Sequence, residues 1–195
     1  AIGSEFKPIE VDELAKTALL SKVGTKKPFV LYTGGCDERK NLPRLIEAWS
    51  KLPFVVRQSH QLLFAGRMPE GKVAELQRVA RRQGLNHDEL LFSGYVTDEE
   101  LVQLYNLCKL CVFPSWHEGF GLPALEAMAC GAPLIGANTT SLPEVIGIND
   151  ALFDPFDINA IRTKMQDALT DQAFLLKLRN HGRQQSQRFS WDKTA

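Results

Sequence analysis

Short apolar runs alternate along this 195-residue chain with longer stretches of helical period. A short run of apolar residues predicts a buried strand, and apolar residues spaced three or four apart predict an amphipathic helix. Their alternation is typical of β–α–β units, whose right-handed crossovers place helices on both faces of an open parallel sheet. The sequence therefore predicts an α/β domain of three layers, a Rossmann-like sheet flanked by helices.

The predicted elements follow one another without an internal repeat, a low-complexity tract or a polar linker, so we expect one domain. Asn41 is expected to cap a helix, and Thr97 with Glu100 three residues later predicts a capping box. Strands are expected at 29–35, 61–66, 90–94, 110–114, 133–137 and 151–155. Helices are expected at 8–24, 41–52, 70–84, 97–107, 122–130, 157–169 and 171–187.

Both ends of the chain suggest a piece of a longer protein. Residues 1–6, AIGSEF, resemble a translated cloning site, and we interpret them as an expression scar that leaves 7–195 as the folded domain. The last residues, QRFSWDKTA, stop inside a potential helix with neither a cap nor a glycine.

Composition excludes several classes of protein. Lys and Arg together number 23, as do Asp and Glu, and this zero net charge argues against a nucleic-acid-binding domain. No apolar run reaches the roughly 18 residues of a membrane-spanning helix. The four scattered cysteines are too few for a disulfide framework, and their spacing fits neither a redox pair at a helix start nor a four-ligand zinc site. We expect buried, reduced thiols at Cys36, Cys108, Cys111 and Cys130, no bound metal, and a cytoplasmic protein.

Three glycine-containing polar segments each follow a predicted strand. They are GGCDERKN at 34–41, SGYVT at 93–97 and SWHEGFG at 115–121. Because ligands of open parallel sheets bind at the carboxyl ends of the strands, the three segments should meet at one edge. This placement predicts a site for a nucleotide-type ligand.

The first segment has the chemistry of a diphosphate site. Gly34 and Gly35 allow positive φ and close backbone approach, and Arg39 and Lys40 precede a helix N-terminus, which itself favours anions. The segment matches neither a P-loop nor a GxGxxG turn. From these residues alone, a solvated basic turn ahead of a helix explains the pattern equally well.

The third segment introduces two glutamates, Glu118 in the loop and Glu126 on the following helix. Converging carboxylates can accept hydrogen bonds from a ribose or a hexose, while Gly119 and Gly121 leave backbone N–H groups free in the turn. The alternative is that Glu126 is an acidic residue in the first helical turn, stabilised by the helix dipole. The residues alone leave both interpretations open.

The stretch SWHEGFGLPALEAMACGAPLI, residues 115–135, resembles the Glu-x7-Glu segment of family 4 retaining glycosyltransferases, which have the two-domain GT-B fold. YTGGCDERKN resembles the donor-phosphate loop of that family, LLFSGYVTDEEL the base-binding turn, and SLPEV the segment that often follows. The resemblance covers residues 28–191 and implies the C-terminal, donor-binding half of a GT-B fold. The N-terminal, acceptor-binding domain is absent from this chain.

The resemblance also implies roles for individual residues. Lys40 would neutralise the donor diphosphate in place of a metal, with Arg39 assisting, and Glu118 would lie beside the donor sugar. Glu126 would bind the ribose hydroxyls. The remaining donor contacts would come from Gly34, Gly35, Tyr95 and Val96 beside the base, and the backbone of Gly119, Phe120, Gly121 and Leu122.

One position departs from the family pattern. Many relatives carry an arginine directly after the first glycine of the phosphate loop, where this chain has Gly35. Either Arg39 supplies the missing charge, or the diphosphate is held by one cation fewer.

The activity implied for the parent protein is metal-independent transfer of a hexosyl group from UDP- or GDP-hexose to an acceptor hydroxyl, with retention of configuration, in polysaccharide biosynthesis. The acceptor, a glycan or lipid-linked sugar, would be held by the absent domain, and no cofactor is needed. The alternatives are a nucleotide-sugar-binding fragment without activity and a non-hydrolysing nucleotide-sugar epimerase. Arg78, Arg81 and Arg82 form a solvated helix face or, in a peripheral enzyme, a contact with anionic lipid at the inner face of a membrane.

Overall fold

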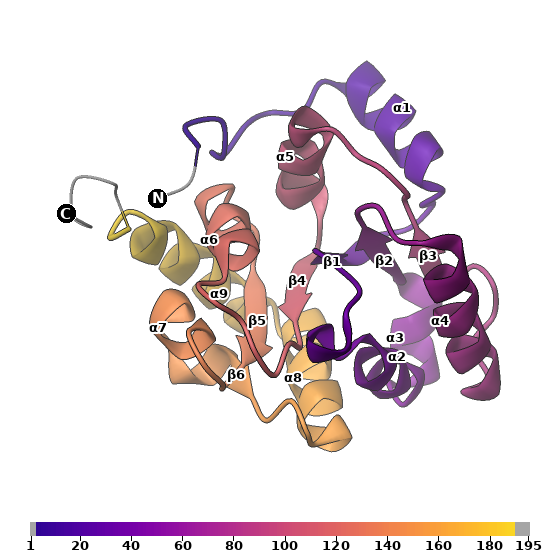
Figure 1. Cartoon of the computed structure of the whole chain (residues 1–195). Coiled ribbons are helices and arrows are strands. Elements are labelled where there is room, and N and C mark those ends of the chain that lie inside the picture. The colour runs from indigo at the N-terminus through magenta and orange to yellow at the C-terminus, as the bar shows by residue number, and fades with distance from the viewer. Residues whose placement is uncertain (1–2, 190–195) are drawn as a thin grey trace.

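The computed structural model describes residues 3–189, which form a six-stranded sheet with helices on both faces (Figure 1). All paired strands are parallel, and their order in the sheet is β3-β2-β1-β4-β5-β6. The strands are β1 (Phe29–Thr33), β2 (Gln61–Ala65), β3 (Leu90–Phe92), β4 (Leu110–Phe113), β5 (Leu134–Ala137) and β6 (Leu152–Phe153).

The connections between the strands are mainly helical. The α-helices are α1 (Glu13–Val23), α2 (Leu42–Ser50), α3 (Phe54–Ser59), α4 (Glu70–Arg82), α5 (Asp98–Leu107), α6 (Leu122–Ala129), α7 (Leu142–Ile146), α8 (Ile158–Thr170) and α9 (Gln172–Ser186). Two short 3-10 turns, η1 (Glu38–Lys40) and η2 (Asn149–Ala151), precede α2 and β6.

Helices pack in two layers, which meet where α8 contacts α9. Helix α2 contacts α4 and α8 in one layer, and α6 contacts α5, α7 and α9 in the other. Every residue of β1, β2, β4 and β5 is buried, as expected for strands covered on both faces. Burial on both faces explains why these strands are continuous apolar runs. The predicted three-layer α/β fold is confirmed.

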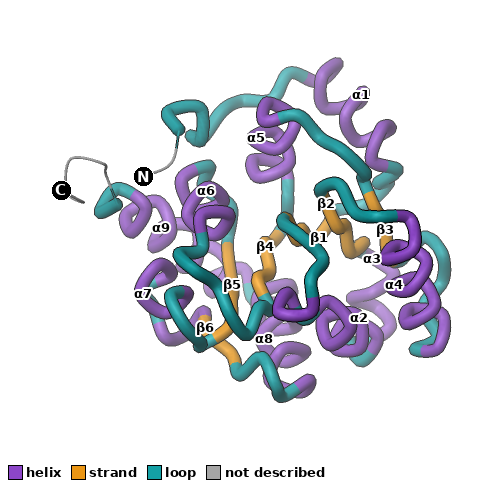
Figure 2. The backbone as a smooth tube through the Cα atoms, in the orientation of Figure 1, coloured by secondary structure: helices purple, strands orange, loops and turns teal. Residues whose placement is uncertain are grey.

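The strand order reverses direction at the centre of the sheet, between β1 and β4. Leu31 of β1 is paired with Leu63 of β2 on one side and with Cys111 of β4 on the other. From β1, the next two strands are added on one side of the sheet, β2 and then β3. The connection after β3 returns across the sheet and places β4 on the other side of β1. At such a point, the loops that follow the two neighbouring strands lead in opposite directions. Ligands of open α/β sheets bind between these loops. Figure 2 shows the loops after β1 and β4 side by side at this point.

Several sequence predictions can be compared with the structure in detail. The capping box of Thr97 and Glu100 is present, with both reciprocal hydrogen bonds. The first helix begins at Glu13, capped by the Asp12 side chain, rather than at residue 8. Helices α3 and α7 were not predicted, because helices of five or six residues carry too little periodicity to be recognised.

The prediction for Asn41 was right in position and wrong in mechanism. Asn41 immediately precedes α2, but its backbone is left-handed, with φ of 59°, and its side chain makes no capping bond. The amide nitrogen instead donates to the carbonyls of Pro114 at 3.0 Å and Pro155 at 2.7 Å. Two hydrogen bonds to residues distant in the sequence have therefore taken the place of the predicted helix cap.

The remaining predictions concern the cysteines and the first residues. All four cysteines are free; Cys108, Cys111 and Cys130 are buried as predicted, whereas Cys36 is half-buried. Phe6 packs against the core, with its ring centroid 6.3 Å from that of Tyr105. The interpretation of residues 1–6 as a scar stays a prediction. Across residues 3–189, no helix has both the length and the apolar character needed to cross a membrane.

Candidate active site

An ion pair between Lys40 and Glu118 joins the loops after β1 and β4. The Lys40 Nζ atom donates to Glu118 Oε1 at 2.7 Å and to Oε2 at 2.9 Å. Only about a tenth of each side chain is exposed to solvent. Two of the residues singled out in the sequence, 78 positions apart, are therefore in direct contact. The pairing leaves the third N–H of the ammonium group without a partner among the described residues.

The loop after β1 is shaped by close backbone packing. Gly34 has φ of 135°, and Gly66, which follows β2, has φ of 129°. A Cβ atom on Gly66 would lie 3.2 Å from the carbonyl oxygen of Gly34, so a larger residue would push the two loops apart. The sequence pattern indicates Gly34 but not Gly66, because the contact depends on which strand lies beside β1.

Tyr32 holds the same loop from inside the sheet. Its hydroxyl donates to the carbonyl oxygen of Gly35 at 2.6 Å. Burial raises the pKa of the Tyr32 phenol well above its ordinary value, and the nearby Glu118 carboxylate raises it further. The phenol therefore stays protonated and serves as a fixed donor to the loop.

The loop carrying Glu118 is held by contacts from two directions. The backbone N–H of Trp116 donates to the carbonyl of Arg39 at 3.0 Å, which joins this loop to the one after β1. The backbone N–H of Glu118 donates to Thr140 Oγ1 at 3.0 Å. Thr140 has φ of 51°, an uncommon conformation for a residue other than glycine. The sequence gives no signal for this contact.

Backbone donors line the turn that follows Glu118. The N–H groups of Gly119, Phe120 and Gly121 find no hydrogen-bond acceptor within the described part of the chain. Gly121 has φ of 89° and directly precedes α6, whose N-terminus adds partial positive charge. Gly121 also faces Leu142, where a Cβ would come within 3.1 Å. The turn can therefore offer several donors to an anion or a sugar.

Glu126 lies at the fifth position of α6, beyond the first helical turn. The first turn itself contains no acidic residue. The interpretation of Glu126 as a first-turn acid is therefore wrong. Its Oε2 atom lies 3.4 Å from the Tyr105 hydroxyl, which also contacts Thr33 Oγ1 at 2.8 Å. Burial raises the pKa of the Glu126 carboxyl. A half-buried carboxylate with one long hydrogen bond retains capacity for further donors.

The other predicted residues are more exposed. Arg39 is exposed and pairs with Asp37, with its Nε atom 2.7 Å from Oδ1. Tyr95 has 67% of its surface exposed and Val96 is half-buried, both in the loop between β3 and α5. Leu122 begins α6 and is also exposed. The structure thus brings Lys40 and Glu118 together, but it does not bring Arg39 into their ion pair.

Across residues 3–189, no three His, Cys, Asp or Glu side chains cluster closely enough to hold a metal ion. The electropositive groups around Glu118 are the Lys40 ammonium, the free backbone N–H groups and the N-terminus of α6. These groups can stabilise an anionic group.

Comparison with known proteins identifies the family. The family model described as glycosyl transferases group 1 matches residues 20–187, and the chain belongs to this family. Glu118, Lys40 and Glu126 all lie within the matched region.

Individual relatives agree with this assignment. The chain is 45% identical over 195 residues to the serotype-specific mannosyltransferase WbdA of Escherichia coli, an alignment that covers 100% of this chain and 24% of the relative. It is 30% identical to sucrose-phosphate synthase of Thermosynechococcus elongatus, with a TM-score of 0.78 and coverage of 97% of this chain and 47% of the other. The chain therefore spans about a quarter of the first and about half of the second.

A third comparison concerns the fold alone. The C-terminal domain of a group 1 glycosyl transferase, LpcC of Francisella tularensis, superposes with a TM-score of 0.76 at 23% identity. The match covers 94% of each chain. An isolated C-terminal domain of the same size thus has the same architecture, which agrees with the predicted half of a GT-B fold.

Proposed function

We propose that this chain is the donor-binding domain of a glycosyltransferase and that its parent protein transfers a mannosyl group from a nucleotide diphosphate sugar. The Lys40–Glu118 ion pair at the switch point of the sheet carries the proposal. It places a cation for a diphosphate and a carboxylate for a sugar within 2.7 Å of each other. The mannosyltransferase relative supports the choice of hexose, whereas the base, UDP or GDP, is left to the experiment.

Each residue of the site has a role in this proposal. Lys40 contacts the diphosphate and stabilises the negative charge that develops on the leaving nucleotide, as a preorganised cation can. Glu118 accepts hydrogen bonds from the sugar, and the free N–H groups of Gly119, Phe120 and Gly121 donate to sugar or phosphate oxygens. Glu126 accepts from the ribose hydroxyls. No metal or other cofactor takes part, and the anomeric configuration is retained.

The secondary donor contacts are also proposals. Gly34 and Gly35 let the diphosphate approach the backbone, while Tyr95 and Val96 flank the base. Arg39 would have to leave Asp37 to reach the diphosphate. Because Asp37 competes for its guanidinium, we propose that the diphosphate is held mainly by Lys40 and the backbone, with one cation fewer than in many relatives.

Replacement of Lys40 by Ala tests the proposal directly. One lost charge-assisted hydrogen bond is worth about 1.5–3 kcal/mol, so affinity for GDP-mannose or UDP-mannose should fall about tenfold to a hundredfold. Isothermal titration of the chain measures the change. Lys51→Ala is the matched control, because Lys51 follows the far end of α2 and forms a more exposed pair with Glu47. Unchanged affinity in Lys40→Ala would refute the phosphate assignment.

The alternatives make different predictions for product formation. A fragment that only binds the donor transfers no sugar to an added acceptor, whereas the full-length parent protein does so. An epimerase changes the sugar on its nucleotide without any acceptor, and product analysis by chromatography reveals it. The acceptor, a glycan or lipid-linked sugar, would be held by the parent's acceptor domain.

Contact of the parent protein with the inner face of a membrane is a separate proposal. Arg78, Arg81 and Arg82 are all exposed on the C-terminal half of α4, so they can reach anionic lipid headgroups. The cytoplasmic location belongs to the same proposal and rests on the four free thiols. Sedimentation with anionic vesicles, compared for the parent protein and its Arg81→Glu variant, tests the lipid contact.

A further inference from the structure

A hollow of about 670 Å³ adjoins the loop that carries Lys40 but is not lined by the Lys40–Glu118 pair. Its walls are residues 36–38 of that loop, the start of α2, the first half of α4 and the side chain of Trp116. The volume falls within the range of about 300–1,000 Å³ that is typical of small-molecule sites. Trp116 precedes Glu118 by two residues, so the hollow and the candidate active site share a loop.

The aromatic wall of the hollow is rigid. The Trp116 ring stacks on Phe156 with centroids 5.9 Å apart and an interplanar angle of 17°. The guanidinium carbon of Arg44 lies 5.6 Å from both ring centroids, and its Nη1 atom donates to Asn41 Oδ1 at 3.1 Å. A side chain already fixed in the free protein loses little conformational entropy when a ligand binds.

Most carboxylates of the hollow are held in ion pairs. Its wall contains two cations, Arg44 and Lys72, and four carboxylates: Asp37, Glu38, Glu47 and Glu75. Lys72 pairs with Glu75 at 2.9 Å, and two other carboxylates pair with residues outside the wall, Asp37 with Arg39 at 2.7 Å and Glu47 with Lys51 at 3.1 Å. Glu38 is the one lining carboxylate that has no ion pair among the described residues.

This arrangement selects a class of ligand. With Arg39 and Lys51 counted, four cations face four carboxylates, so the hollow has no excess positive charge to attract an anionic group, and the described residues contain no cluster able to hold a metal. Three carboxylates held in ion pairs, the unpaired Glu38 carboxylate and the Arg44 guanidinium, which is hydrogen-bonded to Asn41, present hydrogen-bond acceptors and donors next to an aromatic face. A pyranose ring, with one apolar face and a rim of hydroxyl groups, matches both features.

We propose that this hollow is a carbohydrate subsite that holds part of the acceptor glycan beside the donor site. Trp116 stacks on a sugar ring, while Glu38 and Arg44 bind its hydroxyl groups. The shared loop orients the bound glycan toward Glu118. Naming the ligand as the acceptor rests on the proposed glycosyltransferase function, whereas the binding of an oligosaccharide does not.

Titration of the chain with a short α-linked manno-oligosaccharide, without nucleotide, tests the subsite. Amide chemical shifts should move around Trp116, Glu38 and Arg44. Trp116→Ala should weaken binding about tenfold, the usual cost of removing an aromatic anchor. Phe54→Ala is the matched control, because Phe54 is an exposed aromatic residue of α3 and does not line the hollow; affinity should be unchanged.

Two further variants keep the result interpretable. Trp116→Phe retains a flat ring and should lose about threefold in affinity, and Glu38→Gln removes only a surface charge and should lose a similar amount. Circular dichroism confirms that each variant is folded. No shifts in the wild-type chain, or equal affinity for the oligosaccharide in wild type and Trp116→Ala, would overturn the subsite.

A donor titration of the same samples separates the two proposals. If mannose nucleotides bind and the oligosaccharide does not, the subsite is wrong and the donor assignment stands. If the oligosaccharide binds and the nucleotides do not, the donor assignment is wrong and the hollow remains a carbohydrate site.

Discussion

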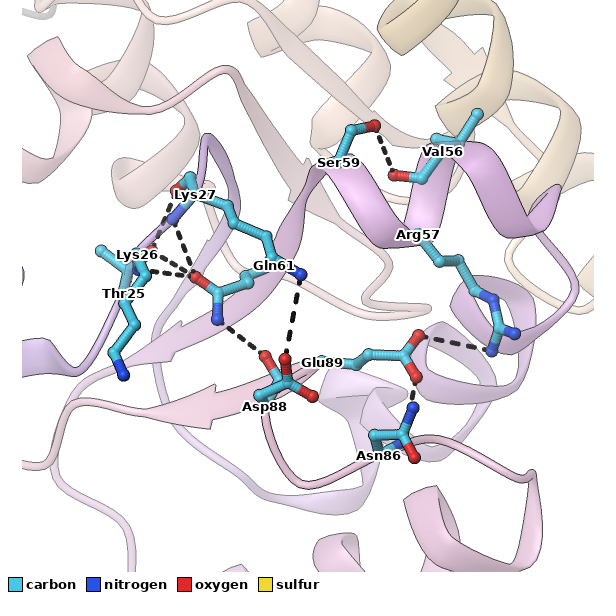
Figure 3. Close-up of polar contacts among 10 residues, drawn as sticks. All are labelled: Thr25, Lys26, Lys27, Val56, Arg57, Ser59, Gln61, Asn86, Asp88 and Glu89. Carbon is cyan, nitrogen blue, oxygen red and sulfur yellow. Dashed lines mark hydrogen bonds and ion pairs between the residues drawn. The ribbon is translucent and has the colours of Figure 1, made fainter.

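One partly buried ion pair lies at the amino-terminal ends of the strands, here called the amino edge, and another lies at their carboxyl-terminal ends, the carboxyl edge. The surroundings of the two pairs differ. At the amino edge, Arg57 Nη1 lies 3.4 Å from Glu89 Oε1, while Glu89 Oε2 accepts from the backbone N–H of Asn86 at 2.9 Å (Figure 3). At the carboxyl edge, Lys40 and Glu118 form their pair beside backbone N–H groups that have no acceptor in the described residues.

Gln61, at the start of β2, connects much of the amino edge, although Arg57 Nε and Glu89 Oε1 are buried there without a hydrogen-bond partner among the described residues. Its side-chain oxygen accepts from Thr25 Oγ1 and from the backbone N–H groups of Lys26 and Lys27, and its nitrogen donates to the carbonyl of Asp88 (Figure 3). Hydrogen bonds of this kind join three segments that are distant in sequence. A region whose polar groups bond to one another stabilises the fold, and a region that leaves donors free can bind a ligand.

The comparison predicts that the amino-edge pair matters most for stability. Arg57→Ala leaves the Glu89 carboxylate nearly buried without its cation, and loss of one partner of such a pair costs about 3–5 kcal/mol. Urea unfolding should show the loss, while donor affinity stays unchanged at low temperature. Lys51→Ala, which opens an exposed pair, should cost less than about 1 kcal/mol. Equal losses in the two variants would remove the distinction between buried and exposed pairs.

Asn41 is an exception to this contrast, because it lies at the carboxyl edge and yet makes structural hydrogen bonds. Asn41→Ala removes two buried hydrogen bonds, to the carbonyls of Pro114 and Pro155, and should cost about 2–3 kcal/mol of unfolding free energy.

Asn41→Gly separates the loss of the hydrogen bonds from the strain that a positive φ imposes on alanine. Glycine accepts the positive φ of this position but cannot make the bonds. Asn41→Gly should therefore be less destabilised than Asn41→Ala, as measured by urea unfolding. If both variants are as stable as the wild-type chain, the carboxyl edge contributes nothing to stability through this residue.

Glu118→Gln tests how the ion pair at the carboxyl edge affects ligand binding. Freed from its carboxylate partner, Lys40 should bind a nucleoside diphosphate about threefold more tightly, whereas the nucleotide sugar should bind about tenfold more weakly because a charged sugar acceptor is lost. Calorimetry with both ligands measures the two opposite changes. Glu89→Gln, the same substitution at the amino edge, should change stability and leave both affinities alone. A parallel response of both ligands would exclude competition between Glu118 and the diphosphate for Lys40.

The smallest expected effect concerns the pH dependence of stability. Burial raises the Glu126 pKa above its ordinary value of 4.5, so folding penalises the charged form. That penalty is present above the raised pKa and disappears below the ordinary one. Glu126→Gln should therefore melt at a higher temperature than wild type at neutral pH, with a difference that vanishes toward pH 4.

Glu100 should respond with the opposite sign. Its pKa is lowered, first by the Lys22 side chain and then by the backbone of Thr97, so its charged form stabilises the fold. This stabilisation is present above the ordinary pKa and is lost as the pH falls through the lowered one. Glu100→Gln should therefore be destabilised at neutral pH. Scanning calorimetry from pH 4 to pH 8 compares the variants, and the same sign for both would contradict the assigned causes.

The sequence by itself determined the α/β class, the helices with clear periodicity and the segments that hold the site. These follow from local rules: apolar runs form buried strands, 3.6-residue periodicity forms helices, and carboxyl ends of parallel strands share an edge. The capping box at Thr97 was predictable because all of its atoms lie within four residues.

Only the tertiary structure decided how the site is assembled. Strand order places β4 beside β1, and this adjacency, absent from any local pattern, brings Lys40 to Glu118. The same adjacency turns Asn41 from an expected cap into a bridge between distant carbonyls. The pairing of β1 with β2 sets Gly66 against Gly34, and the pairing of β4 with β5 sets Thr140 against the Glu118 backbone. Sequence specifies which groups are present, but contacts between residues far apart in the chain depend on which strands become neighbours.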